Sequence, residues 1–278
     1  MTLSGLHGGG RGGTQMGKIG CFLVAAVLFC TATTVFAEDV KTGTISGKMM
    51  IKNGGPMANG VVFFFNEASG PPPSPEKYWR VPDEIVGTDG EGNFKAVLLE
   101  GKYYLGASKR KSGQEVGPPQ EGDYFLPVME EKGVPRTFRV GKGKATDIGT
   151  IAEAVPFSRT TIKTGNGITA IEGTITGPDG KPLERAMVFA FLTPAMVGKP
   201  LFVSERTGKD GKYLLRVNQG GNYYLKIREV YGGGAPKVGE IMGGYGQDKP
   251  VPVTITTGKI VKGIDIKGVR FPGRGPNR

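Results

Sequence analysis

The sequence is poor in cysteine and histidine, the side chains that many catalytic and metal sites require. Its 278 residues include two cysteines and one histidine, and all three lie in the first thirty positions: His7, Cys21 and Cys30. Residues 38–278 therefore exclude thiolate nucleophiles, disulfides, histidine acid–base catalysis, His/Cys metal sites and covalent haem attachment. No spacing of Asp and Glu singles out a catalytic carboxylate pair. We predict no catalytic residue, no cofactor and no metal, and hence a protein that is not an enzyme.

Apolar stretches long enough to span a membrane are also lacking. The apolar run at residues 21–29 follows Lys18 and precedes small residues that end at Ala37. A basic start, a short apolar stretch and small residues at the cut are typical of a secretory signal peptide, and the run is too short for a spanning helix. We predict a signal peptide at residues 1–37, cut between Ala37 and Glu38, with residues 1–15 as an upstream extension if translation begins at Met16. The chain would then be exported, to the periplasm or the cell surface, with no integral membrane segment.

Acidic residues are outnumbered by basic ones, 25 to 36, for a formal net charge of +11. Such a surface favours anionic partners, among them acidic polysaccharide, lipid headgroups and acidic proteins. Export argues against nucleic acid.

The most informative feature present is a duplication. Ile45-Ser-Gly-Lys corresponds to Ile171-Glu-Gly-Thr, Thr88 to Thr207, and Gly101-Lys-Tyr-Tyr-Leu to Gly221-Asn-Tyr-Tyr-Leu, at offsets between 119 and 126 residues. A period that long fits a tandem pair of whole domains.

Within each copy, short alternating apolar segments are bounded by Gly, Pro, Asp and Asn, which indicates an all-β domain of seven strands. We expect strands near residues 44–51, 60–66, 83–88, 93–99, 102–108, 135–140 and 146–152, and near 170–176, 186–192, 201–206, 212–217, 222–228, 251–256 and 262–268. Alternation places Tyr103 and Tyr223 inward, and Arg216 and Lys226 outward. Such strands bury their apolar faces best as a two-sheet sandwich. We predict domains at 42–152 and 170–269, a linker at 153–169 and a disordered basic tail at 270–278.

The order "Ile-x-Gly-x-Ile", "Pro-Leu-x-x-Ala-x-Val", "Asp-Gly-x-Tyr" and "Gly-x-Tyr-x-Leu" resembles the carboxypeptidase regulatory-like domain. The second copy carries it at residues 171–227 and 251–266, and the first matches more loosely, with Phe94 in place of the Tyr. The resemblance implies a transthyretin-like (prealbumin-like) Greek-key sandwich of seven strands, here twice in tandem, that serves as a non-catalytic module for folding, adhesion or binding.

Aromatic residues are the best candidates for ligand or partner contacts. Tyr104 and Tyr224 occupy equivalent positions opposite the inward tyrosines, and the other candidates lie in long loops at residues 66–84 and 229–249: Tyr78, Trp79, Tyr231 and Tyr245. Exposed, they would stack on sugar rings or anchor protein interfaces. The alternative is that the loop aromatics fold back over the sandwich ends, or that the tyrosine pair packs between domains.

Two other site types are disfavoured. Asp89, Glu91 and Asn93 alternate as in a calcium loop, but Phe94 stands where such a loop needs Gly, which favours a hairpin turn. A Lys–Asn cross-link would start from Lys48, but the expected last strands contain no Asn.

Three functions remain open. The first is an exported binding or assembly module that mediates protein–protein contacts in the cell envelope. The second is a carbohydrate-binding pair that uses the candidate aromatics. The third is an accessory subunit of an envelope or surface complex, docking through loops 109–135 and 229–249.

Overall fold

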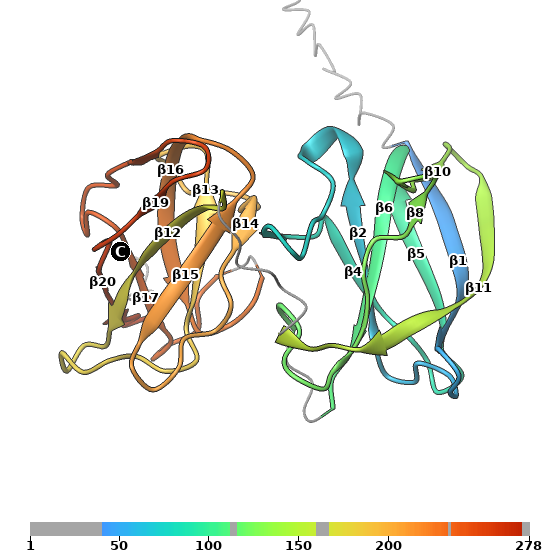
Figure 1. Cartoon of the computed structure of the whole chain (residues 1–278), viewed down its shortest axis with the longest axis horizontal. Coiled ribbons are helices and arrows are strands. Elements are labelled where there is room, and N and C mark those ends of the chain that lie inside the picture. Colours follow the sequence, from blue (N-terminus) through green and yellow to red (C-terminus); the bar gives the residue numbers. More distant parts are fainter. Residues whose placement is uncertain (1–40, 112–115, 160–166, 233–234, 274–278) are drawn as a thin grey trace, which may run out of the picture. The chain divides into compact units, whose positions relative to one another are not determined.

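The computed structural model describes residues 41–111, 116–159, 167–232 and 235–273, and these belong to one compact unit, residues 40–278. The predicted fold class is confirmed: the described elements are β-strands and short 3₁₀ turns, among them η1 (Glu67–Ser69), and the strands form two β-sheet bodies, one in each repeat (Figure 1). None of the helical structure in these ranges is long and apolar enough to cross a membrane. The predicted signal peptide and its cut between Ala37 and Glu38 lie outside the described residues.

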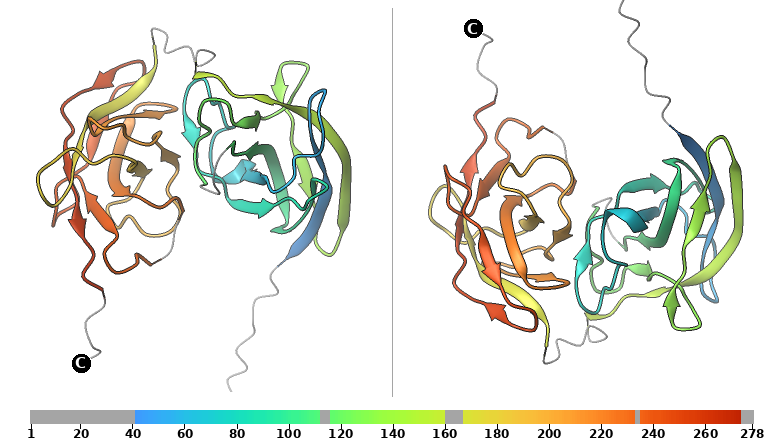
Figure 2. Two further views of the ribbon diagram at one scale, coloured as in Figure 1. Left: turned by 90° about the horizontal axis from the view of Figure 1, so that it is seen from below. Right: turned by 90° about the horizontal axis from the view of Figure 1, so that it is seen from above.

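The first repeat supplies β1 (Thr42–Ile51), β2 (Val61–Asn66), β3 (Trp79–Arg80), β4 (Glu84–Gly87), β5 (Asn93–Leu99), β6 (Gly101–Lys109), β7 (Tyr124–Leu126), β8 (Glu130–Glu131), β9 (Val134–Pro135), β10 (Phe138–Val140) and β11 (Ala145–Pro156). The sheet order is β4-β2-β6-β7-β11-β1-β5, with β10 also paired to β6. The long strands β1 and β11 run parallel and side by side (Figure 2). Beyond Ala154, β11 pairs instead with β7, so one strand links the two layers of the sandwich.

The second repeat supplies β12 (Thr169–Thr176), β13 (Met187–Phe191), β14 (Phe202–Val203), β15 (Lys212–Val217), β16 (Gly221–Arg228), β17 (Ile241–Gly244), β18 (Val253–Ile255), β19 (Ile260–Val261), β20 (Ile266–Lys267) and β21 (Val269–Arg270). One sheet has the order β15-β12-β19, with β20 also on β12. The other has the order β21-β17-β16-β13-β14-β3, with β18 also on β16, and its last strand comes from the first repeat.

Side-chain alternation was predicted well for the core faces. Tyr103 lies in the core of the first repeat and Tyr223 in that of the second, each 2–3% exposed. Their hydroxyls also make the same bond: Tyr103 donates to the carbonyl of Leu99, and Tyr223 to that of Gln219, each at 2.9 Å. The duplication therefore extends to individual hydrogen bonds.

A buried threonine repeats in the same way. Thr88 Oγ1 accepts from the amide of Gly60 and donates to the carbonyl of Met57. Thr207 Oγ1 accepts from the amide of Ala186 and donates to the carbonyl of Leu183. Each hydroxyl thus bridges a backbone amide and a backbone carbonyl inside its repeat.

The structure differs from the predicted boundaries at several places. The loop predicted at 109–135 contains β7, which pairs with β6 and β11. Residues 153–156, predicted as linker, are the last four residues of β11, because pairing with β7 continues the strand. The loop predicted at 229–249 contains β17, which pairs with β16 and β21. Arg270, predicted to begin the disordered tail, ends β21. Residues 274–278 of that tail lie outside the described residues.

Candidate functional site: the junction between the repeats

The long loop between β2 and β4 is the most distinctive feature of the chain, because it adds a strand to the other repeat. Within it, β3 pairs antiparallel with β14, so that Arg80 is opposite Phe202 and Trp79 opposite Val203. The amide of Val81 continues the ladder by donating to the carbonyl of Leu201 at 2.9 Å. The exposed edge of β14 is thereby covered from within the same chain.

Tyr78 belongs to the core of the second repeat. Its ring lies edge-on to that of Phe202, with centroids 5.2 Å apart, and it is only 7% exposed. Its hydroxyl donates to the carbonyl of Pro72 at 2.8 Å, and burial raises the pKa of Tyr78. A residue of one repeat thus completes the hydrophobic core of the other.

Trp79 packs on the opposite face of the same strand pair. Its ring lies 6.0 Å from that of Phe125 and 6.1 Å from that of Phe157, and the two phenylalanines are 5.7 Å apart. The guanidinium of Arg216 lies 5.9 Å from the centre of the indole and donates to the carbonyl of Glu76. Arg216, predicted to point outward to solvent, is instead 4% exposed because this loop covers it.

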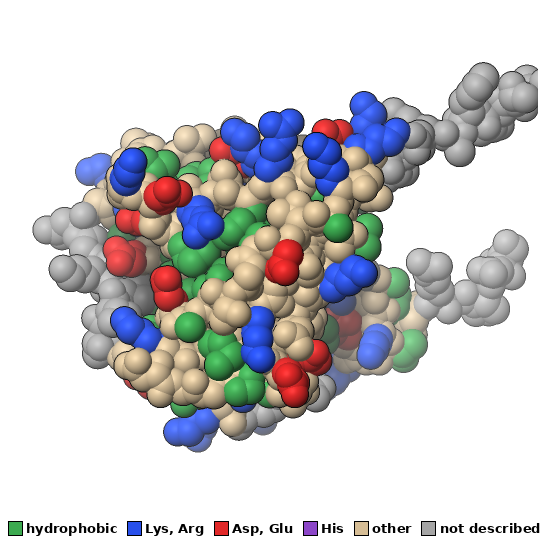
Figure 3. Space-filling view, turned by 90° about the vertical axis from the view of Figure 1, so that its right-hand side faces the viewer, with side chains coloured by type: hydrophobic (Ala, Val, Ile, Leu, Met, Phe, Trp, Pro, Cys, Tyr) green, Lys and Arg blue, Asp and Glu red, His purple; other side chains and the backbone are tan. Residues whose placement is uncertain are grey.

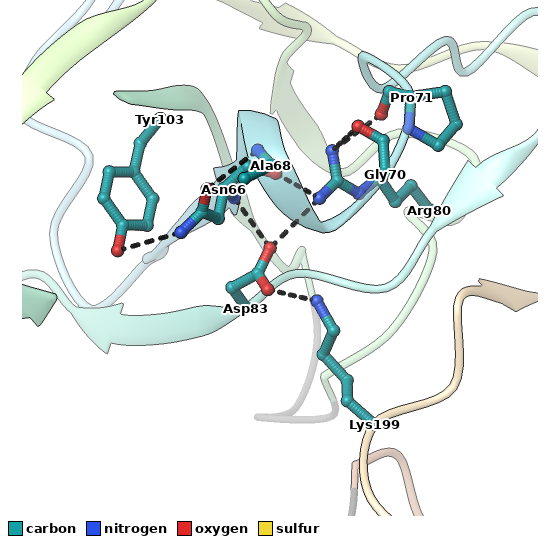
Figure 4. Close-up of polar contacts among 8 residues, drawn as sticks. All are labelled: Asn66, Ala68, Gly70, Pro71, Arg80, Asp83, Tyr103 and Lys199. Carbon is teal, nitrogen blue, oxygen red and sulfur yellow. Dashed lines mark hydrogen bonds and ion pairs between the residues drawn. The ribbon is translucent and has the colours of Figure 1, made fainter. Parts of the chain in front are cut away.

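Arg80 holds the loop in shape. It is buried, and its two terminal nitrogens donate to the carbonyls of Gly70, Pro71 and Asn66 and to the carboxylate of Asp83 (Figure 4). Burial lowers the pKa of Arg80, and the charge of Asp83 opposes that shift. Four acceptors around one guanidinium fix the path of the chain on either side of β3.

Asp83 connects this network to the second repeat. Its Oδ2 accepts from the amide of Asn66 at 2.7 Å as well as from Arg80, and its Oδ1 pairs with Lys199 (Figure 4). Burial lowers the pKa of Lys199, and the contact with Asp83 opposes the change. The junction therefore combines a strand pair, a buried aromatic residue and an ion pair.

The space left at the junction is too small for a sugar. A mostly apolar cavity of about 50 Å³ is lined by aromatic and proline residues, among them Phe65, Pro73, Tyr78, Trp79 and Tyr231. Such a volume holds a few water molecules at most. Among the described buried side chains, Trp79 Nε1 and Arg80 Nε have no hydrogen-bond partner.

The expectation that the candidate aromatics are exposed is wrong for Tyr78, Trp79 and Tyr104, each 7–8% exposed. Tyr104 does point away from the sandwich core, but it packs with Phe63 and Phe65 in a second cluster on the outer face of the sheet. Tyr224, Tyr231 and Tyr245 are half-buried, the first two against the cluster around Trp79.

The sequence carried a signal for these outer clusters. Residues 61–65 read Val-Val-Phe-Phe-Phe, and residues 186–191 read Ala-Met-Val-Phe-Ala-Phe. Nearly continuous apolar runs are typical of strands that are buried on both faces. The outer residues of β13, Met187, Phe189 and Phe191, accordingly contact Trp79 and its neighbours.

Each long loop after the fifth predicted strand is held by a buried ion pair. Arg110 binds Asp123 at 2.5 Å in the first repeat. Arg228 binds Glu240 through two hydrogen bonds of 2.7 and 3.1 Å in the second. The offsets of 118 and 117 residues lie just below the 119–126 of the duplication, so the pairs occupy corresponding places, although the sequence pattern alone did not single them out.

Elsewhere, Asp89 is engaged in a turn. Its carboxylate accepts from the amides of Glu91 and Asn93 and from the Asn93 side chain, and those Asn93 bonds lower its pKa. Within the described ranges, no three His, Cys, Asp or Glu side chains are grouped so as to hold a metal ion.

A more open cleft of about 590 Å³ lies in the second repeat, where Tyr245, Gln247, Asp248 and Asp265 contribute to its walls. It has the size and the polar groups to accept a small ligand.

Comparison with known proteins gives no family. No protein-family model and no curated protein matches the sequence. Among solved structures, a streptococcal ancillary pilin is 15% identical with a TM-score of 0.25, over 85% of this chain and 64% of the pilin. The Bacillus anthracis TIE protein is 16% identical with a TM-score of 0.25, over 82% of this chain and 34% of that protein. The minor pilin GBS52 of Streptococcus agalactiae is 14% identical with a TM-score of 0.22, over 85% of this chain and all of that one.

The chain thus spans less than two thirds of the first two of these proteins. TM-scores this low carry no argument; the strands and their pairing define the fold.

Proposed function

We propose that this chain is an exported, non-catalytic assembly module of the cell envelope that mediates protein–protein contacts. The observation that supports it best is the junction, where β3 of the first repeat extends a sheet of the second and Tyr78 enters its core. Two domains, at residues 42–152 and 170–269, would then act as one stiff unit. A stiff unit holds its outer loops at a fixed separation, which is what a scaffold or spacer needs.

The two loops predicted to dock, 109–135 and 229–249, carry exposed apolar side chains. Val230 and Val238 are 51% and 78% exposed in the loop at 229–249, and Val134 is 64% exposed at the end of the loop at 109–135. The buried ion pairs hold these loops at Asp123 and Glu240, and Val134 lies in the β8–β9 pair. A partner that binds there would therefore order little further chain. An accessory role in a larger envelope complex is one form of the same proposal.

A pull-down from the native envelope fraction tests the proposal. The exported protein should retain a partner, and Val134→Asp with Val238→Asp should release it. Val97→Asp is the matched control, since Val97 is 65% exposed on β5, which belongs to neither loop and pairs with β1. Retention of the partner by the loop variant would refute docking through the loops. Turnover of a substrate that survives repurification would refute the non-catalytic role.

As a second proposal, the cleft beside Tyr245 binds carbohydrate. The ring of Tyr245 is half-buried, and Gln247 and Asp248 offer polar groups to the hydroxyls of a sugar. Binding to a glycan array that Tyr245→Ala abolishes, and that Tyr224→Ala leaves intact, would support it. An array without any signal would remove it.

A further inference from the structure

Five exposed basic residues gather at the end of the first repeat where the described chain begins. Lys41 precedes β1, Lys102 lies near the start of β6, and Arg139 lies in β10. The other two, Lys142 and Lys144, lie in the turn from β10 to β11. We call these five residues the basic end.

Backbone contacts show that these residues are neighbours. Arg139 is directly opposite Lys102 in the antiparallel pair of β10 and β6. The turn at 141–144 is bonded to the start of β1, since Gly143 donates to the carbonyl of Thr42 and Thr44 to that of Lys144. Figure 3 shows several Lys and Arg side chains along the upper margin of this face, with Asp or Glu side chains among them and other basic side chains scattered below.

We expect the Arg139–Lys102 pair to cost stability, which argues for a role outside folding. Like charges directly opposite each other on a sheet are destabilising. Two acidic residues of the described ranges lie beside it: Glu67 is 3.7 Å from Lys102, and Glu100 donates its backbone amide to the carbonyl of Lys41. Among the described residues, the positive charges of Lys41, Lys102, Arg139 and Lys144 outnumber these two carboxylates.

Exposed aliphatic side chains lie beside the basic end. Leu99 is 55% exposed and pairs with Thr42, the residue after Lys41, and Val97 is 65% exposed two positions along β5. Figure 3 shows apolar surface below the basic margin. The one aromatic ring in β10, Phe138, is 7% exposed, so it offers no platform for a sugar. Basic residues next to exposed aliphatic ones suit a lipid surface better than a polysaccharide.

The course of the chain agrees with this choice. Only eleven residues separate Lys41 from the end of the apolar run at 21–29, a stretch that spans at most about 40 Å. Before the predicted leader is cut, the basic end would therefore stay near the membrane that holds the leader.

We propose that the basic end of the first repeat docks on an anionic lipid surface. Lys and Arg would face the headgroup phosphates, and Leu99 would reach the upper acyl region. The inference concerns one face of the first repeat, so it stands or falls separately from the assembly role.

Co-sedimentation with vesicles tests this proposal on the protein as recovered after export. Binding to vesicles of phosphatidylcholine with phosphatidylglycerol should be strong at low salt, weaken as salt rises, and be absent with phosphatidylcholine alone. Lys102→Ala with Arg139→Ala should lower the vesicle affinity about thirtyfold, at about fivefold for each charge removed. Lys181→Ala with Lys209→Ala, in exposed turns of the second repeat, should change it little.

Leu99→Ser should weaken binding without changing its dependence on salt. The proposal is overturned if the two double variants lose affinity equally, or if anionic and neutral vesicles bind alike. It is also overturned if the protein ignores vesicles but binds a soluble acidic polysaccharide through Lys102 and Arg139. Thermal unfolding of each variant separates lost binding from lost folding.

Discussion

The ring of Tyr78 in the first repeat meets the ring of Phe202 in the second edge-on, 5.2 Å apart, inside the second repeat's core. Its neighbours along the chain, Trp79 and Arg80, are tied to the same repeat by the β3–β14 pairing. The loop is therefore part of the folding unit of the second repeat although it belongs in sequence to the first.

Tyr78→Ala should lower the free energy of unfolding by about 3–5 kcal/mol, because it leaves a cavity where a large aromatic ring was buried. Urea unfolding, monitored by tryptophan fluorescence, measures this free energy, since Trp79 is the single tryptophan and lies at the junction. Tyr78→Phe keeps the ring and loses one hydrogen bond to Pro72, so it should cost only about 1 kcal/mol. Equal stability of the alanine variant and the parent would contradict the role assigned to this residue.

Glu240→Gln should destabilise the protein by about 3 kcal/mol at neutral pH, because it leaves the buried guanidinium of Arg228 without its charged partner. Glu172→Gln is the control. Its partner Lys262 is exposed, and the loss should stay below about 1 kcal/mol.

The same pair predicts a pH dependence. Burial alone would raise the pKa of Glu240, but the hydrogen bonds from Arg228 and Lys237 outweigh it and hold the pKa below its usual value. A lowered carboxyl pKa stabilises the fold above the unfolded value of about 4.3, and that stability is lost as the pH falls through the folded value. Denaturant titrations at a series of acidic pH values should show a steeper loss in the parent than in Glu240→Gln. Parallel curves would count against the pair.

The core faces could be predicted because strand alternation is local: Tyr103 and Tyr223 point inward as their positions along the strand require. The junction could not be predicted that way, since the pairing of Trp79 with Val203 joins residues more than 120 positions apart. The aromatic pair Tyr78-Trp79 in a proline-rich loop looks like an exposed binding site as long as its pairing with the edge strand β14 is unknown. Arg216 illustrates the same limit, because alternation correctly turns it away from the core but says nothing of the loop that buries it.

Gly211→Ala should destabilise the hairpin before β15 by about 2 kcal/mol. Gly211 has a φ of +67°, and a Cβ there would lie 2.5 Å from the carbonyl oxygen of Ile175. Gly208→Ala in the same turn is the matched control, since its nearest neighbour, a carboxylate oxygen of Asp210, would be at an ordinary 3.5 Å. Thermal or urea unfolding should separate the two variants, and similar losses would refute the steric explanation.

Arg139→Glu should raise the stability of the protein and lower its affinity for anionic vesicles. It places a carboxylate opposite Lys102 in the β10–β6 pair and turns a repulsion into an attraction, which should raise the free energy of unfolding by about 0.5 kcal/mol. The same change removes positive charge from the basic end, so affinity for anionic vesicles should fall. Lys181→Glu makes the same reversal in an exposed turn of the second repeat and should alter neither quantity appreciably. A variant that is more stable yet binds less would mean that the like-charge pair is kept for what it binds, whereas a loss of stability would show that Arg139 is there for the fold.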